Sequence, residues 1–343
     1  MILPGDAPES IAAAARCIRS GRLLGLPTET VYGLAANADD DTAVAKIFQA
    51  KGRPADHPLI VHVADACAVA HYASEVPEFA RQLMQAFWPG PLTLILPRRP
   101  GVANAAAGGN ATIGLRCPSH PVAQAVLKAL MHDAVWGVAA PSANQFGRVS
   151  PTTADHVQGE FGGDLLILDG GACTVGIEST IIDCTRGRPV LLRPGAVTPA
   201  QVQAVCGLKV GSKDEPDALD APAPKASGTL ESHYAPLAQV RLMSASDLQA
   251  SLDRLVVEDA PAVSGGMPRL GIYSRAIINA SKVEVLCRRM PDDAAATAQQ
   301  LFALLRELDA QGVRQIWIEA PPASPEWDGV RDRLQRAAAD QVL

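Results

Sequence analysis

The chain contains the stretch Leu26-Pro27-Thr28-Glu29-Thr30-Val31-Tyr32-Gly33-Leu34 and, about one helix later, the stretch Lys51-Gly52-Arg53-Pro54. In the first stretch Pro27 closes an apolar strand, two threonine hydroxyls can donate or accept, and Gly33 allows close approach to the backbone. The second stretch brings two positive charges to the end of the next helix. Together they predict a substrate floor beside a cationic phosphate site. Each piece alone also fits a structural role, because Thr often caps turns and Lys favours a helix C-terminus.

Further segments have the same character, and each places a hydroxyl, an amide or an arginine at the end of an apolar run. They are residues 88–93, 112–116, 141–144, 150–152, 176–180 and 192–195. Ligands of open α/β sheets bind where strand ends converge on a crevice. The segments therefore predict one site to which many strands contribute.

Short apolar runs of strand length alternate with helical stretches through the first part of the chain. We expect strands at 22–26, 58–63, 92–97, 111–115, 135–140, 165–168, 180–184 and 190–192, and helices at 8–20, 42–50, 80–86, 121–132, 152–159 and 198–206. This alternation predicts a layered α/β domain, and adjacent strand runs favour a mixed sheet over a wholly parallel one.

The composition changes between residues 209 and 236, where Gly, Ser, Pro and charged residues replace the apolar periodicity. We therefore expect a first domain at 1–208, a linker at 209–236 and a second α/β domain at 237–343. The second domain has strand candidates at 239–242, 270–274, 283–287 and 315–319, with helices near 246–257, 293–311 and 326–338. It contains neither Gly-x-Gly-x-x-Gly nor a Walker-type loop, so we expect no nucleotide site of its own.

Composition argues against several classes of protein. The 343-residue chain has a net charge of −6, and acidic residues outnumber basic ones on both sides of residue 208, so a broad nucleic-acid surface is not expected. Seven widely spaced cysteines without a Cys-x-x-Cys pair favour reduced thiols over disulfides or zinc. The N-terminus lacks a basic start followed by an apolar core, and no segment reaches a membrane-spanning apolar length. We expect a cytoplasmic protein without a membrane segment.

Four cations are the best candidates for ligand contacts: Lys51, Arg53, Arg116 and Arg193. Several cations at strand and helix ends, without a run of acidic partners, predict an anionic ligand such as a triphosphate plus a carboxylate. The alternative is that each arginine pairs with a surface carboxylate. Nucleophilic catalysis finds no support, because Ser142 is not flanked as Gly-x-Ser-x-Gly.

With His233-Tyr234-Ala235-Pro236, these segments closely resemble the threonylcarbamoyl-AMP synthases in their long form. The resemblance covers roughly residues 10–236 motif by motif and rests on the general plan beyond that. It implies a YrdC-like layered mixed-sheet catalytic domain, joined by a lid-like linker to a smaller Rossmann-like α/β domain. Tyr234, which follows a Pro-rich lead, favours a lid over a passive tether.

The resemblance also implies the reaction and its participants. L-threonine, bicarbonate and ATP with Mg2+ would give threonylcarbamoyl-AMP and pyrophosphate, and partner proteins would use the product to modify transfer RNA. The residues that match the family's threonine site are Thr30, His62, Arg116, Ala140 and Ser179. Those that match its ATP site are Lys51, Arg53, His57, Thr112, Ser142, Ser150, Arg193 and Tyr234. Of these, Lys51 and Arg53 are the catalytic candidates, and no protein ligand of the metal is evident.

Two positions depart from the family pattern. His57 stands where the family usually has Asn, and Ser227 where it often has Pro. Two alternatives remain beside the synthase. An RNA-binding module would need a basic stripe with stacking aromatics, but aromatics make up only 4% of the chain. A carbamoyl-transfer maturation factor would add an acylphosphatase-like segment and paired Cys-x-x-Cys zinc motifs, which this sequence does not contain. We expect at most weak direct binding of transfer RNA.

Overall fold

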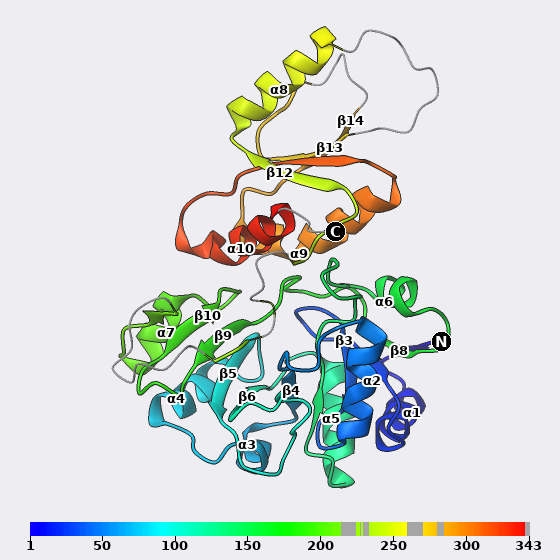
Figure 1. The fold of residues 1–343 in the computed structure, drawn as a ribbon, viewed down its shortest axis with the longest axis vertical. Coiled ribbons are helices and arrows are strands. Elements are labelled where there is room, and N and C mark those ends of the chain that lie inside the picture. The colour runs from blue at the N-terminus through cyan, green and yellow to red at the C-terminus, as the bar shows by residue number, and fades with distance from the viewer. Residues whose placement is uncertain (214–223, 227, 229–232, 259–269, 280–284, 340–343) are drawn as a thin grey trace. The chain divides into compact units, whose positions relative to one another are not determined.

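The computed structural model describes residues 1–213, 224–226, 228, 233–258, 270–279 and 285–339 (Figure 1). Contacts divide the chain into two compact units. The first comprises Met1–Phe146 and Ser150–Thr229, and the second comprises Gly147–Val149 and Leu230–Leu343. Much of the segment on which the lid prediction falls, at 214–223, 227 and 229–232, lies outside the described residues.

The first unit is built on one large mixed sheet with the strand order β1-β8-β2-β3-β7-β4-β6-β5-β9-β10-β11. Parallel pairs such as β4 with β6 and β5 with β9 alternate with antiparallel pairs such as β4 with β7 and β5 with β6. The strands are β1 (Ile2–Pro4), β2 (Leu24–Leu26), β3 (Gly33–Asn37), β4 (Ile60–Val63), β5 (Leu92–Pro97), β6 (Thr112–Arg116), β7 (Gly137–Ala139), β8 (Leu166–Asp169), β9 (Thr180–Asp183), β10 (Val190–Arg193) and β11 (Gly211–Ser212). The predicted mixed α/β sheet is confirmed.

Helices pack on both faces of this sheet. They are α1 (Pro8–Arg19), α2 (Asp41–Lys51), α3 (Val69–Tyr72), α4 (Glu78–Phe87), α5 (Pro121–His132), α6 (Ala154–Phe161) and α7 (Pro199–Cys206). One apolar core joins α2, α3, α4 and α7 to side chains such as Val61, Leu94 and Leu115. A second core joins α1 and α5 to β2, β3, β7 and β8 on the opposite face.

That opposite face is divided between helices and polar side chains. The cross-strand register pairs His62 with Arg116 and Ile60 with Gly114, and paired residues share a face of the sheet. Alternation along each strand points these side chains away from Val61 and Leu115. A small apolar cluster that includes Ile60 and Ile95 continues this face beyond the α1 and α5 core. The sheet thereby presents buried polar groups of β4 and β6 on the face that α1 and α5 only partly cover.

Local capping positions the elements that matter most for the site. The Asp40 side chain accepts hydrogen bonds from Thr42 N and Ala43 N at the start of α2, and Gly52 ends that helix in the left-handed region at φ 62°. Lys51 is consequently the last residue of α2. Three strands were not expected: β1 lies at the start of the sequence, β3 begins at the last two residues of the predicted substrate floor, and β11 lies inside the predicted linker.

The second unit has a four-stranded parallel sheet with the order β12-β15-β13-β14. Its elements are β12 (Gln239–Met243), α8 (Ala245–Glu258), β13 (Leu270–Ser274), β14 (Val285–Arg289), α9 (Ala294–Ala310), β15 (Gln315–Glu319) and α10 (Asp328–Ala338). Figure 1 shows α8 on one face of the sheet and α9 with α10 on the other. This arrangement confirms the predicted smaller Rossmann-like α/β domain.

Candidate functional site

Lys51 is a buried cation with backbone partners. Its ammonium donates to the carbonyl oxygens of Ser142, at 2.7 Å, and Asn144. The side chain is 3% exposed, and this burial, together with the nearby Arg53 charge, lowers its pKa to about 7. Lys51 is therefore poised between its charged and neutral forms near neutral pH.

Two further predicted ATP ligands follow Lys51 along the chain. Arg53 donates through Nη2 to the Pro58 carbonyl at 3.1 Å. The His57 ring lies 5.8 Å from that of Phe146, and partial burial followed by the Arg53 charge lowers the His57 pKa. Phe146 N in turn donates to Lys51 O at 2.9 Å. The segment after β7 is thus tied to the end of α2.

Arg116, at the end of β6, is held by three groups around its guanidinium. Nη2 lies 2.7 Å from Glu29 Oε1, Nη1 donates to Thr30 Oγ1 at 2.8 Å, and Nε donates to Gly90 O at 3.3 Å. Glu29 Oε2 also accepts from Ser119 N at 3.1 Å. Arg116 and Glu29 are almost fully buried, so their charges compensate each other in a dry environment.

His62 lies beside Arg116 on the neighbouring strand β4. Burial and then the Arg116 charge lower its pKa to about 3. The imidazole is therefore neutral at physiological pH. Its Nδ1 is buried, and no described group hydrogen-bonds to it. A neutral imidazole with an unused nitrogen can take a hydrogen bond from a ligand.

Ser179 links the next pair of predicted residues. Its hydroxyl lies 2.7 Å from Thr93 Oγ1, and Arg193 donates to its carbonyl oxygen through Nε at 3.0 Å and Nη2 at 2.9 Å. The preceding residue, Glu178, accepts a hydrogen bond from the buried Ser150 hydroxyl. The segment before β9 therefore gathers three of the predicted ligand residues.

The remaining predicted residues differ in their placement. Ala140 is buried after β7, and its amide donates to Ile60 O at 3.1 Å. Thr112 stands at the opposite end of β6 from Arg116, but on the same face. Tyr234 belongs to the second unit, where its buried ring stacks on Phe302 with centroids 5.4 Å apart. Its contact with ATP stays a prediction.

Two carboxylates of the site had no assigned role in the sequence. Glu29 and Glu178 lie inside the quoted motifs, but the only carboxylate partners that we considered for the arginines were on the surface. Arg116 does have one, and their pair is buried rather than on the surface. The only signal in the sequence was a lone acid inside a hydroxyl-rich motif. The pairing itself could not be seen, because Arg116 is far away in the chain: 86 positions separate it from Thr30, the neighbour of Glu29 that accepts its hydrogen bond.

The side chains of this region are a poor match for a bound metal ion. Within the described part of the chain, no group of three or more His, Cys, Asp or Glu side chains could hold one. Glu29 and Glu178 are both already bonded to neighbouring side chains. The described side chains thus offer no ready-made cage for a resident Mg2+.

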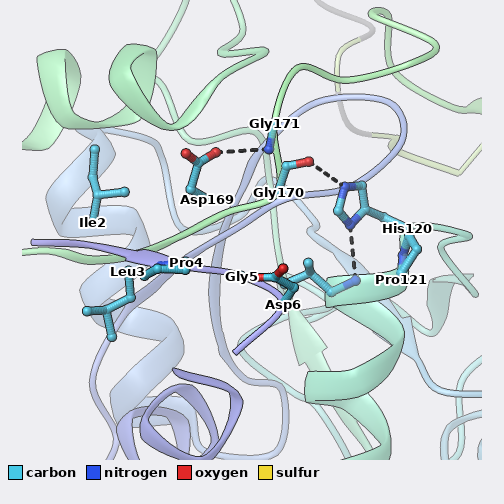
Figure 2. A pocket seen from close by; sticks show the side chains of 11 residues that line it. Ile2, Leu3, Pro4, Gly5, Asp6, His120, Pro121, Asp169, Gly170 and Gly171 are labelled. Carbon is cyan, nitrogen blue, oxygen red and sulfur yellow. Dashed lines mark hydrogen bonds between the residues drawn. The ribbon is translucent and has the colours of Figure 1, made fainter. Parts of the chain in front are cut away.

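A separate cavity of about 730 Å3 lies outside the predicted substrate residues. It is bounded by the turn after β1, the start of α5 and the Gly170-Gly171 turn after β8 (Figure 2). His120 lines it, donating from Nε2 to Gly170 O and accepting at Nδ1 from Val122 N.

No helix among the described residues is long and apolar enough to cross a membrane.

Comparison with known proteins bears on both units. A family model described as "Telomere recombination" matches residues 16–195, and one described as "Threonylcarbamoyl-AMP synthase, C-terminal domain" matches residues 197–339. The threonylcarbamoyl-AMP synthases of Pyrococcus abyssi and Bacillus subtilis are each 37% identical to this chain. The matched regions cover 97% of this chain in both cases, and 95% and 94% of the relatives.

Solved structures give the same answer. The crystal structure of P. abyssi Sua5 complexed with L-threonine superposes with a TM-score of 0.85 at 36% identity, covering 98% of this chain and 97% of that one. The family predicted from the motifs is confirmed over both units. The chain belongs to the threonylcarbamoyl-AMP synthase family, in its long form with a C-terminal domain.

Proposed function

We propose that this protein joins L-threonine, bicarbonate and ATP into threonylcarbamoyl-AMP and releases pyrophosphate. The observation that carries the proposal is that a chain of this family has two buried cations, each in different surroundings. Arg116 is fixed beside Thr30, and Lys51 is held at the end of α2 beside the segment after β7. The first arrangement suits a small amino acid and the second suits phosphate.

Threonine would bind through directed hydrogen bonds. Arg116 would take its carboxylate, because guanidinium and carboxylate form bidentate pairs. Thr30 and His62 would meet its hydroxyl and amino groups, with further contacts from the Ala140 backbone and Ser179. The neutral imidazole of His62 adds no competing charge.

ATP would bind where α2 ends at Lys51 and the chain continues to Arg53. Phosphate oxygens would draw a proton onto Lys51, whose pKa of about 7 leaves it partly neutral without ligand. Thr112, Ser142, Ser150 and Arg193 would hold other parts of the nucleotide, as would His57 and Tyr234. Nucleotidyl transfer needs reactants held in line and charge neutralised on the leaving pyrophosphate, so it requires no protein nucleophile.

Mg2+ would enter as the complex with ATP. This ion keeps several waters and is commonly held through substrate phosphates. Its charge would help to neutralise the triphosphate, while Lys51 and Arg53 orient the same phosphates.

The overall bond changes define what the site must do. A bond forms between the threonine nitrogen and the bicarbonate carbon, and water leaves. A bond also forms between a carbamate oxygen and the α-phosphorus, and pyrophosphate leaves. The adenylate is prone to hydrolysis, so a site that excludes bulk water protects it.

The product would pass to the proteins that transfer the threonylcarbamoyl group to transfer RNA. A net charge of −6 supports hand-over to partners rather than strong direct binding of RNA. We place the protein in the cytoplasm, and the free cysteines accord with a reducing compartment.

The test is an assay of pyrophosphate release with ATP and Mg2+, in which threonine and bicarbonate are omitted in turn. We expect release only with both present, and formation of a threonylcarbamoyl adenylate of the corresponding mass. Release that does not depend on threonine would contradict the proposal.

A further inference from the structure

We propose that Glu29 is a positioning residue, whose carboxylate holds the Arg116 guanidinium in the orientation that meets the substrate carboxylate. This inference rests on the proposed function and adds a residue with no previously assigned role. Glu29 is 4% exposed and lies 2.7 Å from Arg116 Nη2, so the contact is a buried ion pair rather than a surface one.

The contacts of Arg116 leave a defined part of the guanidinium for a ligand. Nη1 donates to Thr30 and Nε donates to Gly90 O, whereas Nη2 lies 2.7 Å from Glu29 Oε1 in an ion pair without a hydrogen bond. Two of the five N–H donors of this arginine are therefore used in hydrogen bonds. The N–H groups that remain on Nη1 and Nη2 are enough for a bidentate carboxylate.

Glu29 itself is anchored on both its side chain and its backbone. Its Oε2 accepts from Ser119 N at 3.1 Å, and its carbonyl oxygen accepts from Val175 N at 2.7 Å. The residue after Ser119 is His120, which spans from the start of α5 to the Gly170 turn (Figure 2). The amide that holds Glu29 therefore belongs to a turn that is fixed in its own right.

Hydrogen bonds also fix the orientation of the two threonine hydroxyls beside Arg116, in the substrate floor. Thr28 Oγ1 donates to Val31 O at 2.6 Å, so its single proton is used. The 2.9 Å contact between the Thr28 and Thr30 hydroxyls must then have Thr30 as donor. Thr30 Oγ1 in turn accepts from Arg116. Thr30 thus presents a remaining lone pair, which accepts from a hydroxyl or amino group of the substrate.

The charges indicate why alignment matters more than attraction here. Glu29 cancels the formal charge of Arg116, and the neighbouring His62 is neutral. An incoming carboxylate therefore meets little net positive charge and depends on directed hydrogen bonds. Two models then make opposite predictions for Glu29→Gln: simple attraction predicts tighter threonine binding, whereas lost alignment predicts weaker binding.

The experiment is a double-mutant cycle of Glu29→Gln and Arg116→Ala in the full chain, read by threonine calorimetry and by KM values for threonine and ATP. For Glu29→Gln we expect threonine affinity to fall and its KM to rise at least tenfold, with the ATP KM changed less than twofold. In the Arg116→Ala background the same substitution should add less than twofold, because Glu29 acts through Arg116.

A matched control is Asp183→Asn. Asp183 is fully buried and pairs with Arg186 at 3.1 Å at the end of β9. This variant should lower thermal stability without changing the threonine KM, which separates positioning from general loss of a buried acid. If Glu29→Gln does not fold, Glu29→Asp keeps the charge at shorter reach and should show the same threonine-specific rise in KM.

Unchanged or tighter threonine binding by folded Glu29→Gln would overturn the role of Glu29, as would independent losses that multiply across the cycle. Failure of the wild-type protein to bind threonine or to release pyrophosphate with it would overturn the proposed function and this role with it. The wild-type arm therefore distinguishes the two failures.

Discussion

Arg116 and Lys51 are both 3% exposed, but their charges are stabilised in different ways. Arg116 has a carboxylate at 2.7 Å and keeps its charge inside a hydrogen-bonded network. Lys51 contacts two backbone carbonyls, and burial followed by the Arg53 charge lowers its pKa to about 7. The comparison teaches that Arg116 is a fixed, charged fork, whereas Lys51 is partly neutral near neutral pH, and we expect Lys51 to gain its full charge when an anion binds.

The largest effect on kcat/KM should come from changing the amino acid that is offered as the substrate. A site that hydrogen-bonds a hydroxyl discriminates strongly against an analogue without one, because its polar groups are left unpaired. We expect kcat/KM for valine to be lower than for threonine by about a thousandfold or more, and serine to be affected far less. Pyrophosphate release with the three amino acids measures this. Similar rates for all three would remove Thr30, His62 and Ser179 from substrate recognition.

Arg116→Ala should be the next most severe change. It removes the fork and leaves Glu29 buried without its partner, so we expect losses of about 3 to 5 kcal/mol in unfolding free energy. Loss of a charged, oriented donor should also lower kcat/KM for threonine by about 2 to 4 kcal/mol in transition-state terms. Chemical denaturation and threonine titrations measure the two effects. Wild-type kinetics in a folded Arg116→Ala variant would reduce Arg116 to a structural residue.

Lys51→Met should act on ATP with a smaller effect on folding. The substitution leaves two carbonyls without their donor but also removes a buried ammonium, so we expect the unfolding free energy to change by about 1 kcal/mol. The loss of a charged phosphate contact should weaken the ATP-dependent step by about 2 kcal/mol or more. The threonine affinity should stay near the wild-type value. A folding loss as large as that of Arg116→Ala would contradict the difference between the two cations.

His62→Gln should have the smallest effect on stability at neutral pH, and its effect on stability should be confined to acid. His62 has a folded pKa of about 3, below its ordinary value of 6.5, so the unfolded chain binds the extra proton between these values. Its contribution to stability is complete above pH 6.5 and is lost towards pH 3, by at most about 1.4 kcal/mol per pH unit. His62→Gln should flatten the acid side of the stability curve. The exposed His132, changed to Gln, serves as the control. If His62→Gln leaves the pH dependence of stability unchanged, the groups that take up the protons lie elsewhere.

Elements with strong local signals could be predicted from the sequence. Asp40 caps the start of α2 and Gly52 follows its end, so the helix at Asp41–Lys51 lies within one residue of the predicted 42–50, because capping depends on residues close together in the chain. The strand β3 was missed because its residues, Gly33–Asn37, include no β-branched or aromatic side chain. It forms through pairing with β2 and β7, which no local pattern encodes.

The candidate site was predictable in its residue types more than in its contacts. The motifs named Thr30, Arg116 and Lys51 individually. They did not indicate that Glu29 would pair with Arg116, or that carbonyls after β7 would hold Lys51, because both contacts join distant segments. Tyr234 shows the same limit, since its stacking on Phe302 depends on tertiary packing rather than on its own motif.

The most direct test of the difference between Arg116 and Lys51 is proton uptake on ligand binding at pH 8, measured by calorimetry in buffers of different ionisation enthalpy. With a pKa of about 7, Lys51 is mostly neutral at this pH, so ATP with Mg2+ should draw up to about 0.9 proton onto it. Binding of threonine should cause almost no proton uptake, because Arg116 stays charged and His62 stays neutral. Lys51→Met should abolish the uptake with ATP. Equal uptake with both ligands, or undiminished uptake in that variant, would contradict the account.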